Sequence, residues 1–137
     1  MRVVIDTNVV VSGVLSPYGP SGRIIDVLLS EVVTVLHDDR ILSEYREVLL
    51  RPAFGFARRD VEGLLAFVEF AGEHISAAPL SLALSDPNDL PFLEVAISGR
   101  ADALITGNLK PFKPRRGKHD VVVIAPADFV RCSGAFS

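Results

Sequence analysis

The chain has little cysteine, no large excess of charge of either sign and no long apolar run. Of its 137 residues only Cys132 is a cysteine, which excludes a disulfide framework and a cysteine-based zinc site and favours a reducing, cytoplasmic setting. The formal net charge is −3, so any nucleic-acid partner has to be held by a local basic patch. No apolar stretch approaches the roughly 20 residues of a membrane helix. Asp6 interrupts the first apolar run, which argues against a signal peptide.

The composition is that of an ordinary globular domain. Apolar residues make up 49% of the chain and charged residues 23%, which excludes a disordered tail, a collagen-like fibre and a low-complexity segment. The length corresponds to one domain, expected to span residues 1–137.

Short β-branched runs alternate with longer helical patterns along the chain. This alternation predicts an α/β fold with a parallel sheet, and the wholly apolar first run suits a strand that is covered on both faces. The expected strands are 3–5, 32–36, 74–76, 103–105 and 121–124. The expected helices are 24–29, 38–50, 61–70, 87–98 and 126–130, and 12–22 is expected to be rich in loops.

Polar residues follow two of the expected strands at their carboxyl ends, where parallel α/β sheets place their ligands. Asp6 and Asn8 follow strand 3–5, and Thr106 and Asn108 follow strand 103–105. Asp6 is either a turn or capping residue or a functional carboxylate. Asn8 either caps the next helix or orients Asp6 by hydrogen bonding.

Further acids lie on two expected helices. Glu44 falls at the boundary of the apolar stripe of helix 38–50, so it is either a solvated flank residue or a carboxylate that leans into a cleft. Asp86 and Asp89 open helix 87–98, where acids suit a helix start. Asp89 also shares a face with Leu93 and therefore points partly inward, where an acid needs a partner such as a metal ion.

Together these residues form a candidate site for a hard cation. Carboxylate oxygens without thiolates or clustered histidines favour Mg²⁺ or Mn²⁺. The three histidines are scattered without ligand spacing and are interpreted as structural or surface residues. The candidate ligands are Asp6, Glu44, Asp86 and Asp89, with Asn108 nearby.

Four segments in this order resemble the PIN-domain ribonucleases, in particular VapC-like toxins of toxin–antitoxin systems. The segments are V-V-I-D-T-N-V at 3–9, the helical Ser43-Glu44, D-P-N-D-L-P-F-L-E-V-A at 86–96, and A-D-A-L-I-T-G-N at 101–108. The resemblance covers most of the chain. It implies a three-layer α/β/α fold around a parallel sheet of order 3-2-1-4-5. It also implies a Mg²⁺- or Mn²⁺-dependent endoribonuclease that cleaves single-stranded RNA and is paired with an antitoxin protein.

The resemblance also implies roles for individual residues. Asp6, Glu44 and Asp89 match the metal-binding, catalytic acids, and Asp86 matches a further acid of this branch. Asn8 and Thr106 match the polar residues that support the acidic cluster in this family. Asn108 stands where a fourth acid is usual, and an amide oxygen can bind a hard cation without bringing negative charge. This departure leaves open whether one or two metal ions bind.

Two basic groups are candidates for holding RNA. Lys110, Lys113, Arg115 and Arg116, with Lys118, lie within nine residues beside the candidate site. They form either a phosphate-binding rim or a solubilising surface loop. Phe112 among them either stacks a base or packs beneath the loop. Arg51, Arg58 and Arg59 form a second group, whose position the sequence does not determine.

Two other functions are alternatives to a nuclease, and the sequence argues against the second of them. An inactive or weakly active scaffold of the same fold would bind metal or RNA without turnover, in keeping with Asn108. A signalling receiver domain would need a lysine after the last strand, where this chain has Ala125 and Pro126. A homodimer is also expected. Apolar residues at 27–29 either line a dimer or antitoxin groove or belong to the core.

Overall fold

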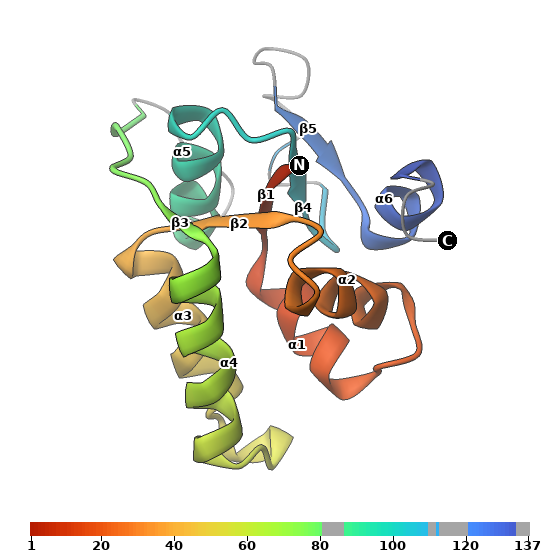
Figure 1. Cartoon of the computed structure of the whole chain (residues 1–137). Coiled ribbons are helices and arrows are strands. Elements are labelled where there is room, and N and C mark those ends of the chain that lie inside the picture. The colour runs from red at the N-terminus through yellow and green to blue at the C-terminus, as the bar shows by residue number, and fades with distance from the viewer. Residues whose placement is uncertain (81–86, 110–111, 113–120, 134–137) are drawn as a thin grey trace.

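The structure is a computed structural model and describes residues 1–80, 87–109, 112 and 121–133 (Figure 1). Five parallel strands form one sheet of order β3-β2-β1-β4-β5. The predicted parallel sheet and its strand order are confirmed. The strands are β1 (Arg2–Ile5), β2 (Thr34–His37), β3 (Glu73–His74), β4 (Ala103–Ile105) and β5 (Val122–Ile124).

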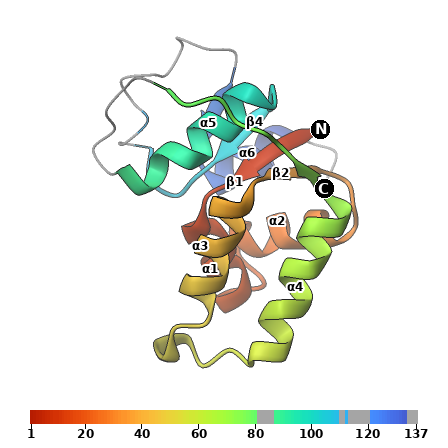
Figure 2. The same ribbon diagram turned by 90° about the vertical axis from the view of Figure 1, so that its left-hand side faces the viewer.

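Helices cover the sheet on both sides, as the predicted α/β/α arrangement requires. Helix α5 packs against β1, β2 and β4, and α1 to α4 lie together on the other side of the sheet (Figures 1 and 2). Two short 3₁₀ turns, η1 (Pro52–Phe54) and η2 (Pro87–Asp89), precede α4 and α5. The helices are α1 (Thr7–Leu15), α2 (Pro20–Leu29), α3 (Asp39–Leu49), α4 (Arg58–Ala71), α5 (Leu90–Ser98) and α6 (Pro126–Ser133).

The core is built around β1, the central strand. Its residues Val3, Val4 and Ile5 are fully buried, because helices cover this strand from both sides. Val4 pairs with Leu104 and Ile5 with Ile105 in the neighbouring β4. This parallel register sets the ends of β1 and β4 side by side at one edge of the sheet.

The prediction that 12–22 is mainly loop is wrong, because α1 extends to Leu15 and α2 already begins at Pro20. Gly13 lies within α1 and allows close packing of α1 on α2. A Cβ atom at Gly13 would lie 2.5 Å from Ile25 Cγ1 and 2.6 Å from the Ser21 carbonyl oxygen. The glycine therefore serves helix packing, which a pattern along one segment does not reveal.

Other boundaries differ by a few residues. Helix α4 begins at Arg58 rather than 61, and α5 begins at Leu90 because a 3₁₀ turn occupies 87–89. Of the apolar residues at 27–29, Val27 and Leu28 belong to the core, whereas Leu29 is exposed. Among the described helices, none has the length and apolar character needed to span a bilayer.

Candidate functional site

The ends of β1 and β4 bring two polar side chains into contact. Asp6 and Thr106 follow the paired residues Ile5 and Ile105. The Asp6 N–H donates to the Ile105 carbonyl oxygen at 2.9 Å, which extends the ladder by one residue. Thr106 Oγ1 donates to Asp6 Oδ2 at 2.7 Å, and both side chains are buried. The register therefore gives one carboxylate oxygen of Asp6 a fixed hydroxyl donor.

The other oxygen of Asp6 starts helix α1. Asp6 is the N-cap, and its Oδ1 accepts a hydrogen bond from the Thr7 N–H at 2.8 Å. The Thr7 hydroxyl donates to Glu44 Oε2 on α3. Thr7 thus holds two carboxylates, one through its backbone and one through its side chain. The capping role of Asp6 is compatible with a functional role, because the two oxygens have different partners.

Tyr45 connects the middle of α3 to the end of β1 by a hydrogen bond. Its hydroxyl donates to the Ile5 carbonyl oxygen in the core. Burial raises the pKa of Tyr45 well above its usual range, and the negative charges of Asp6 and Glu44 act in the same direction. Tyr45 therefore remains a neutral donor and fixes the place on α3 from which its neighbour Glu44 projects.

Asn8 joins the first turn of α1 to the segment that follows β4. Asn8 Oδ1 accepts a hydrogen bond from the Gly107 N–H at 3.2 Å, and the Asn108 N–H donates to Thr106 Oγ1 at 3.1 Å. The hypothesis that Asn8 caps the helix is wrong, because Asp6 occupies the N-cap position. Its contact instead keeps the segment that carries Asn108 against the start of α1.

These side chains surround one open cleft of about 570 Å³ at the carboxyl edge of the sheet. Glu44 borders it, so the hypothesis that Glu44 is only a solvated flank residue does not hold. Asp89 also borders it, and its side chain makes no capping hydrogen bond to α5. The polar lining is Asp6, Thr7, Asn8, Ser12, Glu44, Asn88, Asp89 and Asn108, and the apolar lining is Val11, Val48 and Phe54.

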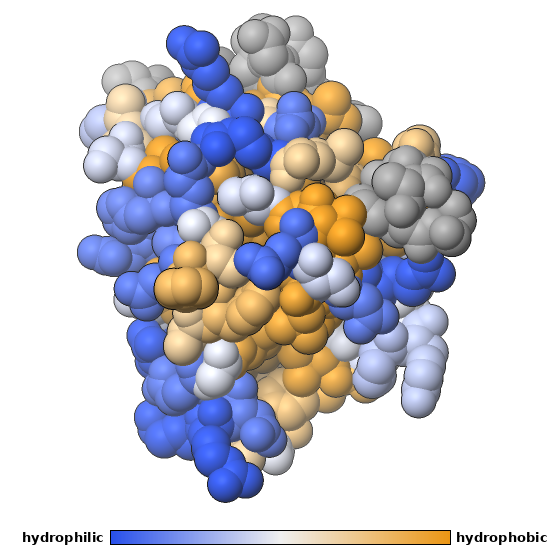
Figure 3. Space-filling model, in the orientation of Figure 1, coloured by the Kyte–Doolittle hydropathy of each residue, from blue (hydrophilic) through white to orange (hydrophobic). Residues whose placement is uncertain are grey.

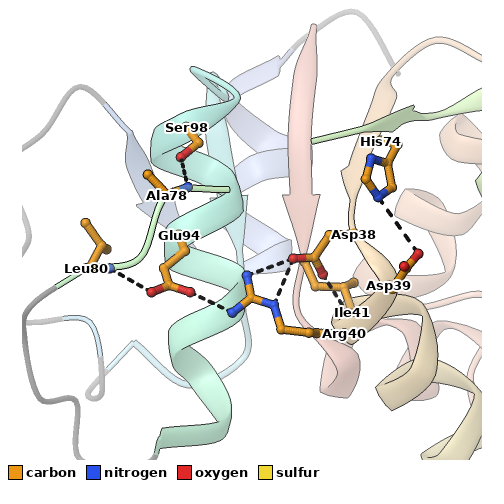
Figure 4. Close-up of polar contacts among 9 residues, drawn as sticks. All are labelled: Asp38, Asp39, Arg40, Ile41, His74, Ala78, Leu80, Glu94 and Ser98. Carbon is orange, nitrogen blue, oxygen red and sulfur yellow. Dashed lines mark hydrogen bonds and ion pairs between the residues drawn. The ribbon is translucent and has the colours of Figure 1, made fainter. Parts of the chain in front are cut away.

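An arginine links the helix that carries Glu44 to the helix that follows Asp89 (Figure 4). Arg40 of α3 donates to Asp38 Oδ2 at 2.7 and 2.9 Å and to Glu94 Oε1 of α5 at 2.7 Å. Glu94 is buried, and its Oε2 accepts a hydrogen bond from the Leu80 N–H at 2.8 Å. The network joins α3, α5 and the segment after β3, and so sets the distance between two walls of the cleft.

The donor set of the cleft suits a hard divalent cation, since its charged groups are carboxylates and its neutral donors include amide oxygens. Among the residues that the structure describes, no three His, Cys, Asp or Glu side chains are close enough to hold a metal ion. Asp86 lies outside those residues. A site with three such ligands therefore needs Asp86 or a movement of the described carboxylates.

Several candidate residues lie outside the described part of the chain, namely Asp86, Lys110, Lys113, Arg115 and Arg116. Phe112 is described and is fully buried, so it packs in the core and does not stack a base. Sequence analysis assigned no role to Thr7, Arg40 or Glu94. Glu94 could have been noticed as a lone acid within the apolar run of α5, which indicates a buried partner.

Comparisons with known proteins agree with this architecture. A family model described as "PIN domain" matches residues 2–110. No curated protein sequence gives a significant match. Among solved structures, the fold is similar to a chain in the crystal structure of VapBC2 from Rickettsia felis bound to a DNA fragment from their promoter, with a TM-score of 0.59 and 17% identity. The match covers 91% of this chain and 98% of that chain, and at this identity it shows the fold.

Proposed function

Because the chain belongs to the PIN domain family, whose proteins are generally nucleases, we propose that it is a metal-dependent endoribonuclease that cleaves single-stranded RNA. The observation that carries the proposal is the convergence of Asp6, Glu44 and Asp89 on one open cleft from three separate parts of the chain. Carboxylates that line one cleft repel one another when they approach, and a divalent cation bound between them would relieve that repulsion. We propose that the chain, 1–137, acts as a single nuclease domain of this family.

PIN domains usually use divalent metals, and Mg²⁺ or Mn²⁺ suits the oxygen donors of this cleft. The bound ion would polarise the phosphate and lower the pKa of its water. Asp6 and Asp89 would bind it directly or through water, with Asp86 as a further ligand. Glu44 would either ligate the ion or orient the attacking water. Asn108 would contribute an amide oxygen in place of a fourth carboxylate.

The remaining polar residues of the cleft would hold the acids in position. Thr106 and Thr7 hydrogen-bond to the two oxygens of Asp6, so its carboxylate cannot rotate freely. Thr7 also orients Glu44, and Asn8 keeps the turn of Asn108 in place. Lys110, Lys113, Arg115 and Arg116 would bind the phosphates of the RNA beside the acids.

We further propose that the protein is the toxin of a type II toxin–antitoxin pair and acts in the cytoplasm, with an antitoxin protein as partner. The similarity to a chain of VapBC2 and the VapC-like motifs support this. Apolar surface is open to solvent on the face of Figure 3, and the exposed side chains at and after the end of α2 include Leu29 and Val32. Such surface suits a protein partner, either the antitoxin or a second copy in a homodimer.

The alternative is a metal- or RNA-binding scaffold with little or no turnover. Asn108 in place of an acid favours it, as does the lack of a three-ligand group among the described residues. Metal binding without RNA cleavage would identify this alternative.

The decisive experiment combines RNA cleavage with thermal unfolding. Wild-type protein should cleave a pool of single-stranded RNA in Mg²⁺ or Mn²⁺ and not in EDTA. At about 100 times its dissociation constant, Mn²⁺ should stabilise the wild type by about 2.7 kcal/mol, which is roughly 6–10 °C in Tm. Asp89→Asn should lose both effects, and Asp26→Asn on the exposed side of α2 should keep them. A Tm rise without cleavage would support the scaffold, and the absence of both would refute the proposal.

A further inference from the structure

The connection between α3 and α4 combines aromatic and basic residues beside the cleft, and nothing in the proposed chemistry uses it. Residues 51–59 are R-P-A-F-G-F-A-R-R and are here called the aromatic–basic connection. This segment contains the second basic group of the sequence and lies at the bottom of Figures 1 and 2, in yellow-green.

Two rings of this connection stack on each other. Phe54 and Phe56 have their centroids 5.8 Å apart and an interplanar angle of 17°. The chain bends between the two rings. Gly55 supplies this bend with a φ of 70°, in the left-handed region that favours glycine. The 3₁₀ turn Pro52–Phe54 precedes it, and the Gly55 N–H donates to the Pro52 carbonyl oxygen at 3.2 Å.

The stacked pair stands between two hollows of the surface. Phe54 lines the cleft that contains the acids, whereas Phe56 lines a neighbouring pocket of about 120 Å³. Within the cleft, Val48 follows Glu44 by one turn of α3, about 6 Å along the helix axis. Phe54, six residues after Val48 in the chain, also lines the cleft. The lining of the cleft thus includes both carboxylates and an aromatic ring that stacks on Phe56.

The three arginines of the connection are exposed and only weakly engaged. Arg51 Nη2 lies 3.9 Å from Glu47 Oε1, and Arg58 Nη1 lies 3.8 Å from Glu62 Oε2. Arg59 makes no ion pair with any residue in the described ranges. Long, exposed ion pairs contribute little free energy, so these side chains can turn to a phosphate at little cost.

We infer that the aromatic–basic connection is a subsite for single-stranded RNA, in which an unpaired base stacks on Phe54 and the arginines contact the flanking phosphates. This inference rests on the proposed function and adds a binding subsite for its single-stranded substrate, because a base within a duplex has no free face for the ring. Aromatic stacking tolerates any base, and arginine contacts to phosphate carry no sequence information. The subsite therefore favours unpaired RNA without selecting its sequence.

Binding of fluorescently labelled oligonucleotides tests the subsite in an Asp6→Asn background, which prevents cleavage. Phe54→Leu keeps an apolar side chain but removes the aromatic face, and should weaken binding of single-stranded RNA by about 5- to 150-fold. Phe54→Trp should restore it. Phe70→Leu is the matched control, because Phe70 is a 90% exposed phenylalanine on α4 that does not line the cleft. Binding of an RNA duplex should not depend on Phe54.

A spectroscopic signal separates stacking from a purely structural effect. The fluorescence of 2-aminopurine in the strand should be quenched by the parent protein and by Phe54→Trp, and not by Phe54→Leu. If Phe54→Leu does not fold, the salt dependence of binding provides the second test. Arg59→Gln should reduce the slope of log K against log salt by about 0.7 for one lost phosphate contact. Arg131→Gln on α6 should leave the slope unchanged.

Each outcome decides the inference separately from the nuclease proposal. If Phe54→Leu binds single-stranded RNA with unchanged affinity and still quenches 2-aminopurine, the subsite is overturned. The proposed cleavage activity of the wild type would not be affected by this result. An unchanged salt slope in Arg59→Gln would remove the arginine from the subsite. If the parent protein bound no single-stranded RNA even at low salt, the subsite would be refuted, and the cleavage assay would decide the proposed function by itself.

Discussion

Two neighbouring strands of the sheet end in the same way and lead to different sites. Asp6 directly follows β1 and caps α1, and Asp38 directly follows β2 and caps α3 through the Ile41 N–H at 3.0 Å. Both residues are almost fully buried, at 6% and 7% exposure. In the order of elements, a strand, an aspartate and a helix, the two positions are equivalent.

Their surroundings differ in the donors that reach each carboxylate. Asp38 Oδ2 accepts two hydrogen bonds from the Arg40 guanidinium, which also binds Glu94. The hydrogen bonds described for Asp6 come from the Thr7 N–H and the Thr106 hydroxyl. A guanidinium offsets the charge of a carboxylate, whereas a hydroxyl or amide orients a carboxylate without cancelling its charge. The comparison indicates a structural role for Asp38, which the Arg40 guanidinium contacts, whereas the described donors to Asp6 orient its carboxylate.

Exchanging each aspartate for asparagine tests this contrast most strongly. Asparagine still caps a helix, so both variants should fold. Asp6→Asn should reduce RNA cleavage by about 100-fold or more, because it removes the charge of a proposed metal ligand, and should leave Tm in EDTA at or above the wild-type value. Asp38→Asn should lower Tm and leave cleavage near wild type. Cleavage rates and melting curves of both variants, measured in parallel, test this. Equal loss of activity in the two variants would contradict the different roles of Asp6 and Asp38.

Removing Arg40 should show how much the network of Asp38, Arg40 and Glu94 contributes to the free energy of unfolding. Arg40→Met leaves the buried Glu94 carboxylate with the Leu80 N–H as its remaining described donor. Because Arg40 is itself about half exposed, we expect a loss of about 2 kcal/mol, less than for a fully buried pair. This corresponds to a fall in Tm of roughly 4–7 °C. Arg46→Met, which breaks the exposed pair with Glu62, is the control and should change Tm little. Similar falls in Tm for Arg40→Met and Arg46→Met would refute the structural role of the network of Asp38, Arg40 and Glu94.

The hydroxyl of Thr7 should matter for activity more than for stability. Thr7→Val keeps the shape and the backbone N–H but removes the donor to Glu44. Loss of a group that orients a metal ligand typically costs about 10-fold in affinity or activity. Thr7→Ser retains the hydroxyl and should stay close to wild type in a cleavage assay. If the serine variant lost as much activity as the valine variant, packing of the threonine methyl group would be the cause.

The end of β2 should also contribute a small pH dependence of stability. Burial lowers the pKa of His37 below its ordinary value of 6.5, His74 acts in the same direction, and Glu69 and Asp38 oppose it. The unfolded chain therefore binds a proton that the folded chain does not, and the free energy of unfolding decreases as pH falls below about 6.5. The decrease ends once the pH is below the lowered pKa of the folded state.

Urea unfolding between about pH 7.5 and about pH 5 measures this effect. His37→Leu should lose less stability over this range than wild type, since it removes the titrating group. His74→Gln, a change at an exposed neighbour, should retain most of the wild-type slope. Parallel pH profiles of wild type and His37→Leu would exclude His37 as the source.

Much of the fold could be predicted because its signals are local. The apolar run at 3–5 indicated a strand that is covered on both faces, and the stripe of Ile41, Leu42 and Tyr45 indicated α3. The failure at residues 12–22 has the opposite origin. Gly13 is required by the side chain of Ile25 on another helix, so no pattern within α1 distinguishes it from a helix breaker.

By itself, the sequence determined the parallel α/β class, the strand ends at which acids gather and, through its motifs, the family. Those properties depend on periodicity and on residue order along the chain. Only the tertiary structure decided that Thr7 bridges Asp6 and Glu44, that Arg40 joins Asp38 to Glu94, and that Phe54 faces the cleft. These contacts depend on how α3 packs against α1 and α5. Thr106 is distant in sequence from Asp6, and Glu94 is distant from Arg40, so only the packing of the elements brings these groups together.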